Sequence, residues 1–185
     1  EKTGEVFFGV NVSGEEDEDV IYQPVYKVKG LAGAVYEITA DEDVITPDGT
    51  LRYHKGDVVD TVTTNEDGKA KSKELYLGKY TVVETKAPNG MVINKEKHSV
   101  ELTYAGQDVA VTETATSFVN ERQKVKISLE KVLEQNETFG IGKNDKIKNI
   151  SFGLYAKEDI VSSSGTVIPA DGLIEISTLD ENGTA

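Results

Sequence analysis

Apolar and polar residues alternate along much of the chain, which is the pattern of β-strands that bury one face. The alternation is clearest from Val6 to Val12, where every second residue is apolar. Further strands are expected at Val100 to Tyr104 and at Val109 to Asn120, and an extended segment at Val20 to Lys29. Short strands of this kind predict an all-β protein built from antiparallel β-sandwiches.

Residue types that favour tight turns separate these strands. Thr46 to Gly49 and Asn65 to Gly68 both end in Asp-Gly, and glycine accepts the positive φ that such turns need. Between the two strand-rich regions, Leu31 to Ile38 leads into another strand. This succession of strands and turns predicts that the sandwich ends near residue 120.

A second copy of the pattern begins at Val125. The face that carries Val125 and Lys131 repeats the face that carries Val6 and Val12 at an offset of 119 residues (125 − 6 and 131 − 12). A lysine therefore ends the apolar face of the second copy, whereas valine stands at the same place in the first. Such self-similarity at a fixed offset indicates an internal repeat.

Two further similarities support the repeat. Tyr155 follows Tyr36 by the same 119 residues, and the segment Thr178 to Ala185 resembles Thr63 to Ala70 at an offset of 115. The sequence ends before the counterpart of Lys71 to Asn120. We therefore expect two domains, residues 1–122 and the first part of a second sandwich at residues 123–185.

One strand carries a candidate functional carboxylate. Alternation places Tyr80, Val82 and Glu84 on the same face, so Glu84 is buried if that face belongs to the core. Val83 makes the opposite face apolar as well, and a solvated glutamate on an edge strand remains an equal alternative. Pro88 and the glycine two residues later end the strand.

These residues also resemble a known family. The motif from Leu77 to Gly90, with Tyr80, Glu84-Thr85 and Ala87-Pro88, follows Leu31-Ala-Gly-Ala-Val-Tyr36 and Thr64-x-x-x-Gly68. Together they are similar to the collagen-adhesin B-type, prealbumin-like domain of Gram-positive surface proteins and SpaA-like pilins. The resemblance covers nearly all of residues 5 to 120, with Met91 where the family usually has tyrosine. It implies tandem prealbumin-like or Ig-like sandwiches, of which the second is incomplete.

The resemblance implies a spontaneous isopeptide bond between a first-strand lysine and a last-strand asparagine, assisted by a glutamate. Glu84 would be the assisting carboxyl and Asn120 the electrophile. Val12 occupies the expected lysine position, so Lys27 or Lys29 would have to substitute, although solvated lysines near a strand end are the simpler interpretation. Lys131 is well placed in the second copy but lacks its partners. We therefore expect no isopeptide bond at the usual position.

Composition restricts the partners. The chain has 33 acidic and 20 basic residues and a net charge of −13, which argues against binding nucleic acid or anionic membranes. It has no cysteine, so disulfides and thiolate metal sites are excluded. The acidic run Glu15 to Asp19 is expected to be a solvated loop, and calcium binding there is weakly supported because the spacing of an EF-hand loop is missing.

The sequence does not suggest a conventional enzyme. His54 and His98 have no ligand-spaced companions, and no glycine-rich phosphate loop opens a helix. We therefore expect no metal site, no cofactor and no catalytic turnover. The chain starts at Glu1 without a signal peptide and has no apolar run of transmembrane length, which suggests a piece of a longer protein.

Two functions follow from the resemblance. The first is a structural stalk or presenting module of a cell-wall-attached, extracellular adhesin or pilus-like protein, whose partners are neighbouring repeats of the same surface protein. The second is a module that binds a host extracellular protein or glycan through its loops, with the tyrosines Tyr22, Tyr26 and Tyr53 as aromatic anchors.

Overall fold

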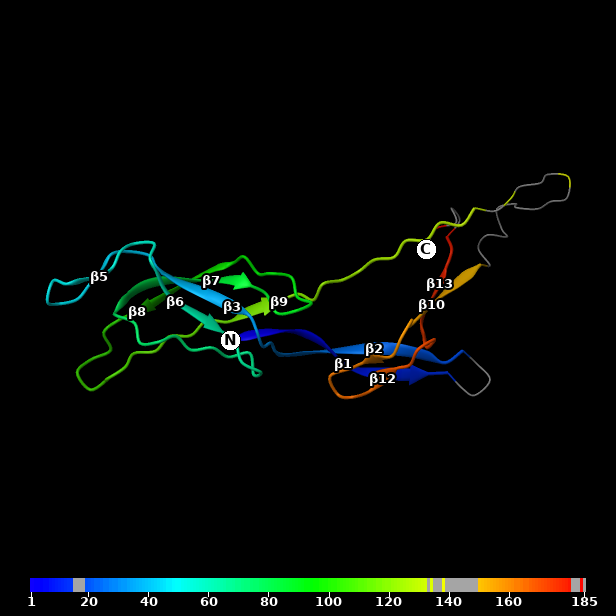
Figure 1. Cartoon of the computed structure of the whole chain (residues 1–185), viewed down its shortest axis with the longest axis horizontal. Helices are drawn as coiled ribbons and strands as arrows, with labels where there is room; N and C mark the ends of the chain where they lie inside the picture. Colours follow the sequence, from blue (N-terminus) through cyan, green and yellow to red (C-terminus); the bar gives the residue numbers. More distant parts are fainter. Residues whose placement is uncertain (15–18, 133, 135–137, 139–149, 181–183, 185) are drawn as a thin grey trace. The chain divides into compact units, whose positions relative to one another are not determined.

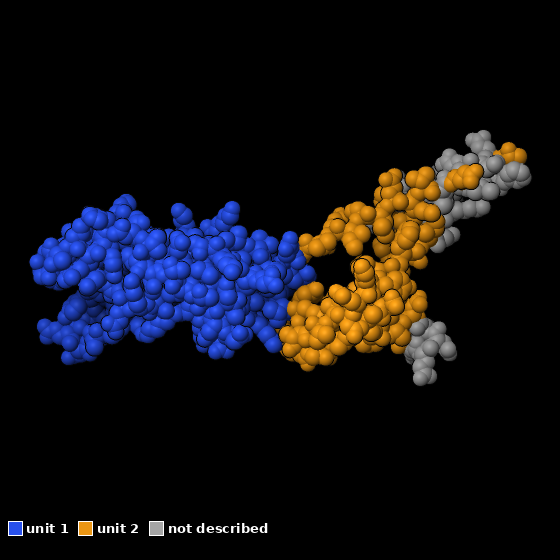
Figure 2. All heavy atoms as spheres, in the orientation of Figure 1, with its two compact units in different colours: residues 1–6, 28–123 blue, residues 7–27, 124–185 orange. Residues whose placement is uncertain are grey.

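The computed structural model describes residues 1–14, 19–132, 134, 138, 150–180 and 184 (Figure 1). The chain falls into two compact units, residues 1–6 with 28–123 and residues 7–27 with 124–185 (Figure 2). The second segment of the first unit ends at residue 123, one residue after the boundary at 122/123 expected from the sequence. Residues 7–27, which we expected in the first domain, group with the second unit because the long strands β1 (Lys2–Ser13) and β2 (Ile21–Gly30) each have residues in both.

The first unit contains a four-stranded antiparallel sheet in the order β6-β3-β7-β8 (Figure 1). A separate short hairpin precedes β6. The strands are β3 (Val35–Ala40), β4 (Val44–Ile45), β5 (Leu51–Tyr53), β6 (Val58–Thr63), β7 (Gly78–Lys86) and β8 (Lys97–Leu102). The all-β prediction is confirmed, and β7 lies between β3 and β8, so it is a central strand of this sheet.

A second layer of the first unit is formed where β1 pairs in parallel with β9 (Phe118–Asn120). Phe118 from β9 packs on Tyr36 from β3, with ring centroids 4.8 Å apart, and both side chains are buried with Ala34. A second cluster, centred on Ile38 and the fully buried Tyr80, fills the rest of the sheet face. The core therefore lies between the four-stranded sheet and the β1–β9 pair.

The second unit is built on the antiparallel pair of β10 (Ser151–Tyr155) and β13 (Leu173–Thr178), and β13 also pairs with β2 at Ile21. A small hairpin joins β11 (Ile160–Val161) to β12 (Val167–Ile168). The buried apolar side chains of this unit are Ala156, Ile168, Leu173 and Leu179. No helix of the described residues is long and apolar enough to cross a membrane.

The β10–β13 pair repeats the register of the β3–β6 pair. Ser151 pairs with Thr178 as Val35 pairs with Thr63, and both ladders shift register after the fourth residue of the first strand. The two strands are therefore related by offsets of 116 (151 − 35) and 115 (178 − 63) residues. The expected equivalence at 119 is wrong for β10, because the register places Phe152, and not Tyr155, in the position of Tyr36.

Two predicted strands do not form. Only residues 118–120 of the segment Val109 to Asn120 are in a strand, and residues 125–131 form no strand. Val125 and Ile127 are exposed by 87% and 60%, and the contact of this segment with the rest of its sheet is a single bridge from Glu130 to Thr184. Alternation produces a strand only where a partner supplies a ladder of hydrogen bonds, and among the described residues this segment has a single bridge and no ladder.

A glycine allows three segments of the first unit to converge. Gly68 has φ of 74°, and a Cβ at this position would overlap the carbonyl oxygen of Lys2 and lie 2.8 Å from Cα of Gly30. The backbone N–H of Lys2 donates to the carbonyl of Gly68 at 2.7 Å. The turn at Asn65 to Gly68 therefore fixes where β1 begins.

We expect Gly68→Ala to lower the free energy of unfolding by about 3 kcal/mol or more, because it adds backbone strain at positive φ to a direct overlap with β1. Gly90→Ala is the matched control, since Gly90 has φ of 75° and open space where its Cβ would lie. The control should cost about 1 kcal/mol. Denaturant titration followed by circular dichroism measures both, and equal losses would contradict this account of the Gly68 turn.

Candidate functional site

Three polar side chains meet in the core of the first unit. Lys2, Glu84 and Asn120 are exposed by 0%, 2% and 2%. Nζ of Lys2 hydrogen-bonds to Oδ1 of Asn120 and lies 3.1 Å from Oε1 of Glu84. Nδ2 of Asn120 donates to the same Oε1 atom at 3.0 Å. The amine, the carboxyl and the amide are thus in mutual contact.

The strands explain why these three side chains point to one place. Phe118 and Asn120 have the same parity on β9, so both face the core while Val119 between them is exposed. The parallel register pairs Lys2 with Phe118, which places the lysine beside the same face. Glu84 pairs with the buried Tyr36 on the opposite layer. Glu84 is therefore a core residue of a central strand, and the interpretation as a solvated edge residue is wrong.

The backbone of Lys2 is held on both sides. Its N–H donates to the carbonyl of Gly68, and its carbonyl accepts the N–H of Leu31 at 3.0 Å. The carbonyl of Leu31 in turn accepts the buried hydroxyl of Thr64 at 2.6 Å. Because the backbone is anchored in this way, the Lys2 side chain enters the core from a defined point.

Aromatic rings enclose the amine. Nζ of Lys2 lies 5.9 Å from the centroid of the Tyr36 ring and 5.8 Å from that of Phe118. The His98 ring stacks on the other side of Phe118 at 3.9 Å, and its Nδ1 contacts Oγ1 of Thr116 at 2.5 Å. These rings keep water away from the three polar side chains.

Burial changes the protonation of the site. Desolvation lowers the pKa of the Lys2 amine from its ordinary value of 10.5, against the hydrogen bond and the charge of Glu84, which raise it. The pKa of the Tyr36 hydroxyl is raised, first by burial and then by the negative charge of Glu84. This hydroxyl is buried and has no hydrogen-bond partner among the described residues. The neutral form of the lysine, which is the nucleophilic form, is therefore favoured relative to a solvated lysine.

The arrangement has the components of acyl transfer to an amine. A buried amine lies against the amide group that it would attack, and one carboxyl oxygen contacts both groups. A carboxyl group in this position can accept a proton from the amine and deliver one to the departing nitrogen. No outside cofactor is needed for such a step.

The other candidate lysines lie elsewhere. Lys27 is exposed, and its Nζ lies 3.7 Å from the ring centroid of Phe8. Lys29 is also exposed, on the same strand. Lys131 is exposed in the second unit, next to the bridge from Glu130 to Thr184. The structure brings none of the three to Glu84 and Asn120.

The lysine that does reach them was missed in the sequence. Alignment of the repeat on the apolar face of residues 6–12 puts Val12 at the nucleophile position. In the structure Val12 is 60% exposed and lies near the far end of β1, whereas the buried Lys2 begins this strand. The expectation that the first copy lacks a first-strand lysine is wrong. The signal was the dipeptide Glu1-Lys2, which recurs as Glu130-Lys131.

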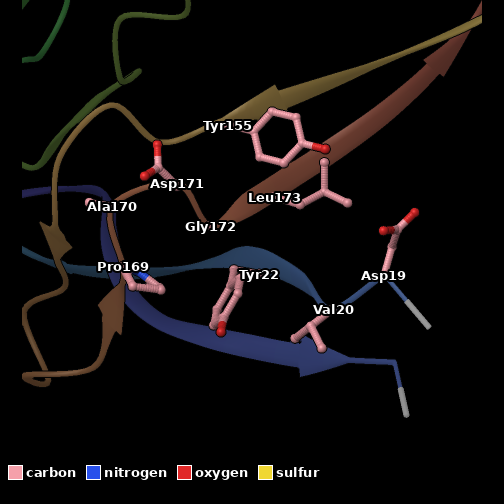
Figure 3. Close-up of a pocket in the computed structure, with 9 residues that line it drawn as sticks. All are labelled: Asp19, Val20, Tyr22, Tyr155, Pro169, Ala170, Asp171, Gly172 and Leu173. Carbon is pink, nitrogen blue, oxygen red and sulfur yellow. The ribbon is translucent and has the colours of Figure 1, made fainter. Parts of the chain in front are cut away.

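The three candidate tyrosines do not form one surface. Tyr53 lies in the first unit, where its ring is 5.7 Å from that of Tyr76. Tyr26 is exposed in the second unit, 6.1 Å from the Phe7 ring. Tyr22 is half-buried and lines a pocket of about 330 Å³ in the second unit, between β2 and the loop that precedes β13 (Figure 3). Asp19 and Asp171 lie at two ends of this pocket (Figure 3).

Of the acidic run Glu15 to Asp19, residues 15–18 lie outside the described part of the chain, and Asp19 is described. Within the described residues no three His, Asp or Glu side chains form a group that could hold a metal ion. His54 is exposed with its Nδ1 3.9 Å from Asp43. His98 is partly buried, and its ring stacks on that of Phe118, so it packs against the core.

Two known proteins are similar to parts of this chain or to most of it. The chain is 30% identical over 77 residues to the trypsin-resistant surface T6 protein of Streptococcus pyogenes serotype M6, covering 40% of this chain and 14% of that protein. The solved structure of the Bacillus anthracis TIE protein matches 95% of this chain and 32% of that chain, with 20% identity and a TM-score of 0.45. The chain therefore spans less than a third of the length of each of these two proteins.

Residues 25–117 match the SpaA family, described as a prealbumin-like fold domain. The match includes Glu84, whereas Lys2 lies well before its start and Asn120 shortly after its end, so the contact among the three is a finding of the structure. The matched segment is half of the chain and contains the whole four-stranded sheet. The chain therefore belongs to the SpaA family of prealbumin-like fold domains.

Proposed function

We propose that the chain is a structural stalk module of a Gram-positive surface protein, and that its first unit is locked by an isopeptide bond between Lys2 and Asn120. The contact among Lys2, Glu84 and Asn120 in a buried site carries the proposal. Membership of the SpaA family and the similarity to a streptococcal surface protein support the location on a cell surface. The partners would be neighbouring repeats of the same protein.

The bond would form when the Lys2 amine replaces the amide nitrogen of Asn120. Transfer of a proton from the Lys2 ammonium to Glu84 leaves both groups neutral, which a desolvated site favours. The Lys2 nitrogen attacks Cγ of Asn120, the bond from Cγ to Nδ2 breaks, and the departing nitrogen leaves as ammonia with protons that Glu84 relays. The products are one amide bond, one ammonia and a protonated Glu84. The step is intramolecular and occurs once, so the chain is not a turnover enzyme.

The position of the bond suits a mechanical role. Lys2 begins β1 and Asn120 ends β9, and these strands are parallel neighbours at the two ends of the first unit's sequence. Tension applied through both ends would therefore pass along the bond without unfolding residues 3–119. By analogy with a long disulfide loop, closing this segment would also stabilise the unit by about 5 kcal/mol.

Intact mass spectrometry tests the bond. The chain is expected to be lighter by one ammonia than its sequence mass, and tryptic digestion should yield a branched peptide that joins Lys2 to Asn120. Lys2→Ala and Asn120→Ala should restore the full mass because each removes one reacting group. Glu84→Gln should leave most of the chain at full mass, because the amide cannot relay the protons.

Lys27→Ala and Lys29→Ala are the matched controls, and both should keep the ammonia loss of the unaltered chain. A chain of full sequence mass would reject the bond. A crosslink that disappears on replacing Lys27 or Lys29, and survives replacement of Lys2, would reject the assignment of the nucleophile.

We further propose that the second unit is an incomplete copy of the first. The matching registers of β10–β13 and β3–β6 support this, as does a shared turn: Asp180 N–H donates to the Thr184 carbonyl as Asn65 N–H donates to that of Lys69, each at 2.9 Å. Lys131 follows a residue that bridges to Thr184, much as Lys2 bonds to the turn at Gly68. Lys131 would then correspond to Lys2.

An open strand edge marks what this copy lacks. In the first unit β3 pairs with β6 on one side and with β7 on the other, whereas β10 lies at the end of its sheet among the described strands. Leu154, the counterpart of Ile38, is 42% exposed, while Ile38 is 7% exposed. A strand equivalent to β7 would pair with this edge of β10 and reduce the exposure of Leu154.

Hydrogen exchange tests the open edge. Alternate amides of β10, those that point away from β13, should exchange orders of magnitude faster than every amide of β3, because amides without a ladder partner open freely to water. The amides of β10 that point toward β13 serve as the internal control. Uniform protection along Ser151 to Tyr155 would show that the edge is covered and would contradict the proposal.

Recognition of a ligand is a second candidate function, which the pocket lined by Tyr22 favours. A pocket lined by an aromatic ring and by the carboxylates of Asp19 and Asp171 suits a sugar or a cationic side chain. Binding of the chain to a host-glycan array and to extracellular matrix proteins, compared with that of Tyr22→Ala, tests it. Tyr53→Ala lies outside the pocket and is the control, and equal binding by all three chains would reject the pocket.

A further inference from the structure

A short segment after β7 runs antiparallel beside β9. The N–H of Gln123 donates to the carbonyl of Gly90 at 2.9 Å, and the N–H of Val92 donates to the carbonyl of Glu121 at 2.8 Å. An antiparallel bridge lies between these two bonds. Continuation of this ladder would place Asn94 opposite Val119, with the backbone N–H of Asn94 on the Val119 carbonyl.

The ladder changes its donor at Asn94. The backbone N–H of Asn94 donates instead to Oε2 of Glu84 at 2.6 Å. Its side-chain Nδ2 donates to the Val119 carbonyl at 3.2 Å, in the place of the missing backbone bond. Its Oδ1 accepts the N–H of Glu96 at 2.9 Å, which holds the carboxamide in position.

This exchange of donors gives the two oxygens of Glu84 different tasks. Oε2 accepts the backbone N–H of Asn94, so it is not the oxygen that delivers a proton. Oε1 faces both Nζ of Lys2 and Nδ2 of Asn120. The orientation of the carboxyl group toward the reacting atoms therefore depends on the N–H at residue 94.

Asparagine suits this position for a chemical reason. Its short side chain carries a donor and an acceptor, so it replaces the ladder bond to β9 and holds the following turn at the same time. Alanine has neither group, and its backbone N–H would be drawn back to the Val119 carbonyl. Aspartate keeps the acceptor but has no donor for Val119. Glutamine keeps both groups on a side chain longer by one methylene.

We propose that Asn94 is a positioning residue of the crosslinking site: its carboxamide replaces a backbone hydrogen bond to β9, and this releases its own N–H to orient the Glu84 carboxyl toward Lys2 and Asn120. The proposal rests on the proposed Lys2–Asn120 bond. Asn94 contacts neither reacting group, so it acts through Glu84 and through the strand that carries Asn120.

The rate of ammonia loss tests the role. The full chain is made by cell-free synthesis and quenched in acid at intervals, and the crosslinked fraction is measured by intact mass. Asn94→Ala should slow the reaction by about tenfold, the effect of losing one hydrogen bond to a charged group. Asn94→Gln should restore part of the rate.

Asn89→Ala is the matched control, since Asn89 is an exposed asparagine in the preceding turn, and it should react at the unaltered rate. If circular dichroism shows that Asn94→Ala does not fold, Asn94→Asp, which is nearly isosteric but replaces the Nδ2 donor by a charged oxygen, carries the same expectation. Reaction of the folded variants at the unaltered rate would overturn the role of Asn94 and leave the crosslink standing. An unaltered chain that never loses ammonia would overturn both.

Discussion

The contact among a lysine, a glutamate and an asparagine in an apolar core imposes the strongest constraint on the first unit. Removing two charged groups from water costs several kcal/mol for each, and the cost is offset only when their hydrogen bonds are made. Lys2 and Glu84 meet this condition through each other, through Asn120 and through the N–H of Asn94. The pairing of β1 with β9 and the central position of β7 follow from the need to bring these groups together.

The surroundings of the site serve the same need. The rings of Tyr36 and Phe118 enclose the amine, and they also form the core contact between the two layers. Gly68 lets the turn approach the backbone of Lys2 more closely than any side chain would permit. The core packing and the turn at Gly68 therefore both hold the site in place. Loss of either would move the Lys2 amine relative to the side-chain carbonyl of Asn120.

The two units show what the full set of strands contributes. Both share the register of a strand pair, the same bulge and the same turn, but the first also has β7, β8 and β9. The chain between Lys2 and β3 is thirteen residues longer than that between Lys131 and β10 (35 − 2 against 151 − 131). The first of these segments contains the long strands β1 and β2. With Lys131 as the proposed counterpart of Lys2, this difference in length means that one fixed offset does not relate the two units.

Local sequence patterns predicted the strand class, the turns at Asp-Gly pairs and the family, and the resemblance named Glu84 and Asn120 as partners. The strands and turns depend on local patterns, since the period of two fixes which residues share a face and glycine fixes where the chain can turn. Whether Glu84 is buried was left open by the sequence and was decided by the structure. The identity of the lysine was not local. Lys2 precedes the alternating run and is separated by Gly4 from Val6, the nearest apolar residue of its own parity. The parallel pairing of β1 with β9, across more than a hundred residues, places it in the core. The same holds for Asn94, whose role depends on a ladder that the sequence does not mark. Tertiary structure also decided that Val125 to Lys131 forms no strand, because an alternating segment becomes a strand only when another backbone offers its hydrogen bonds.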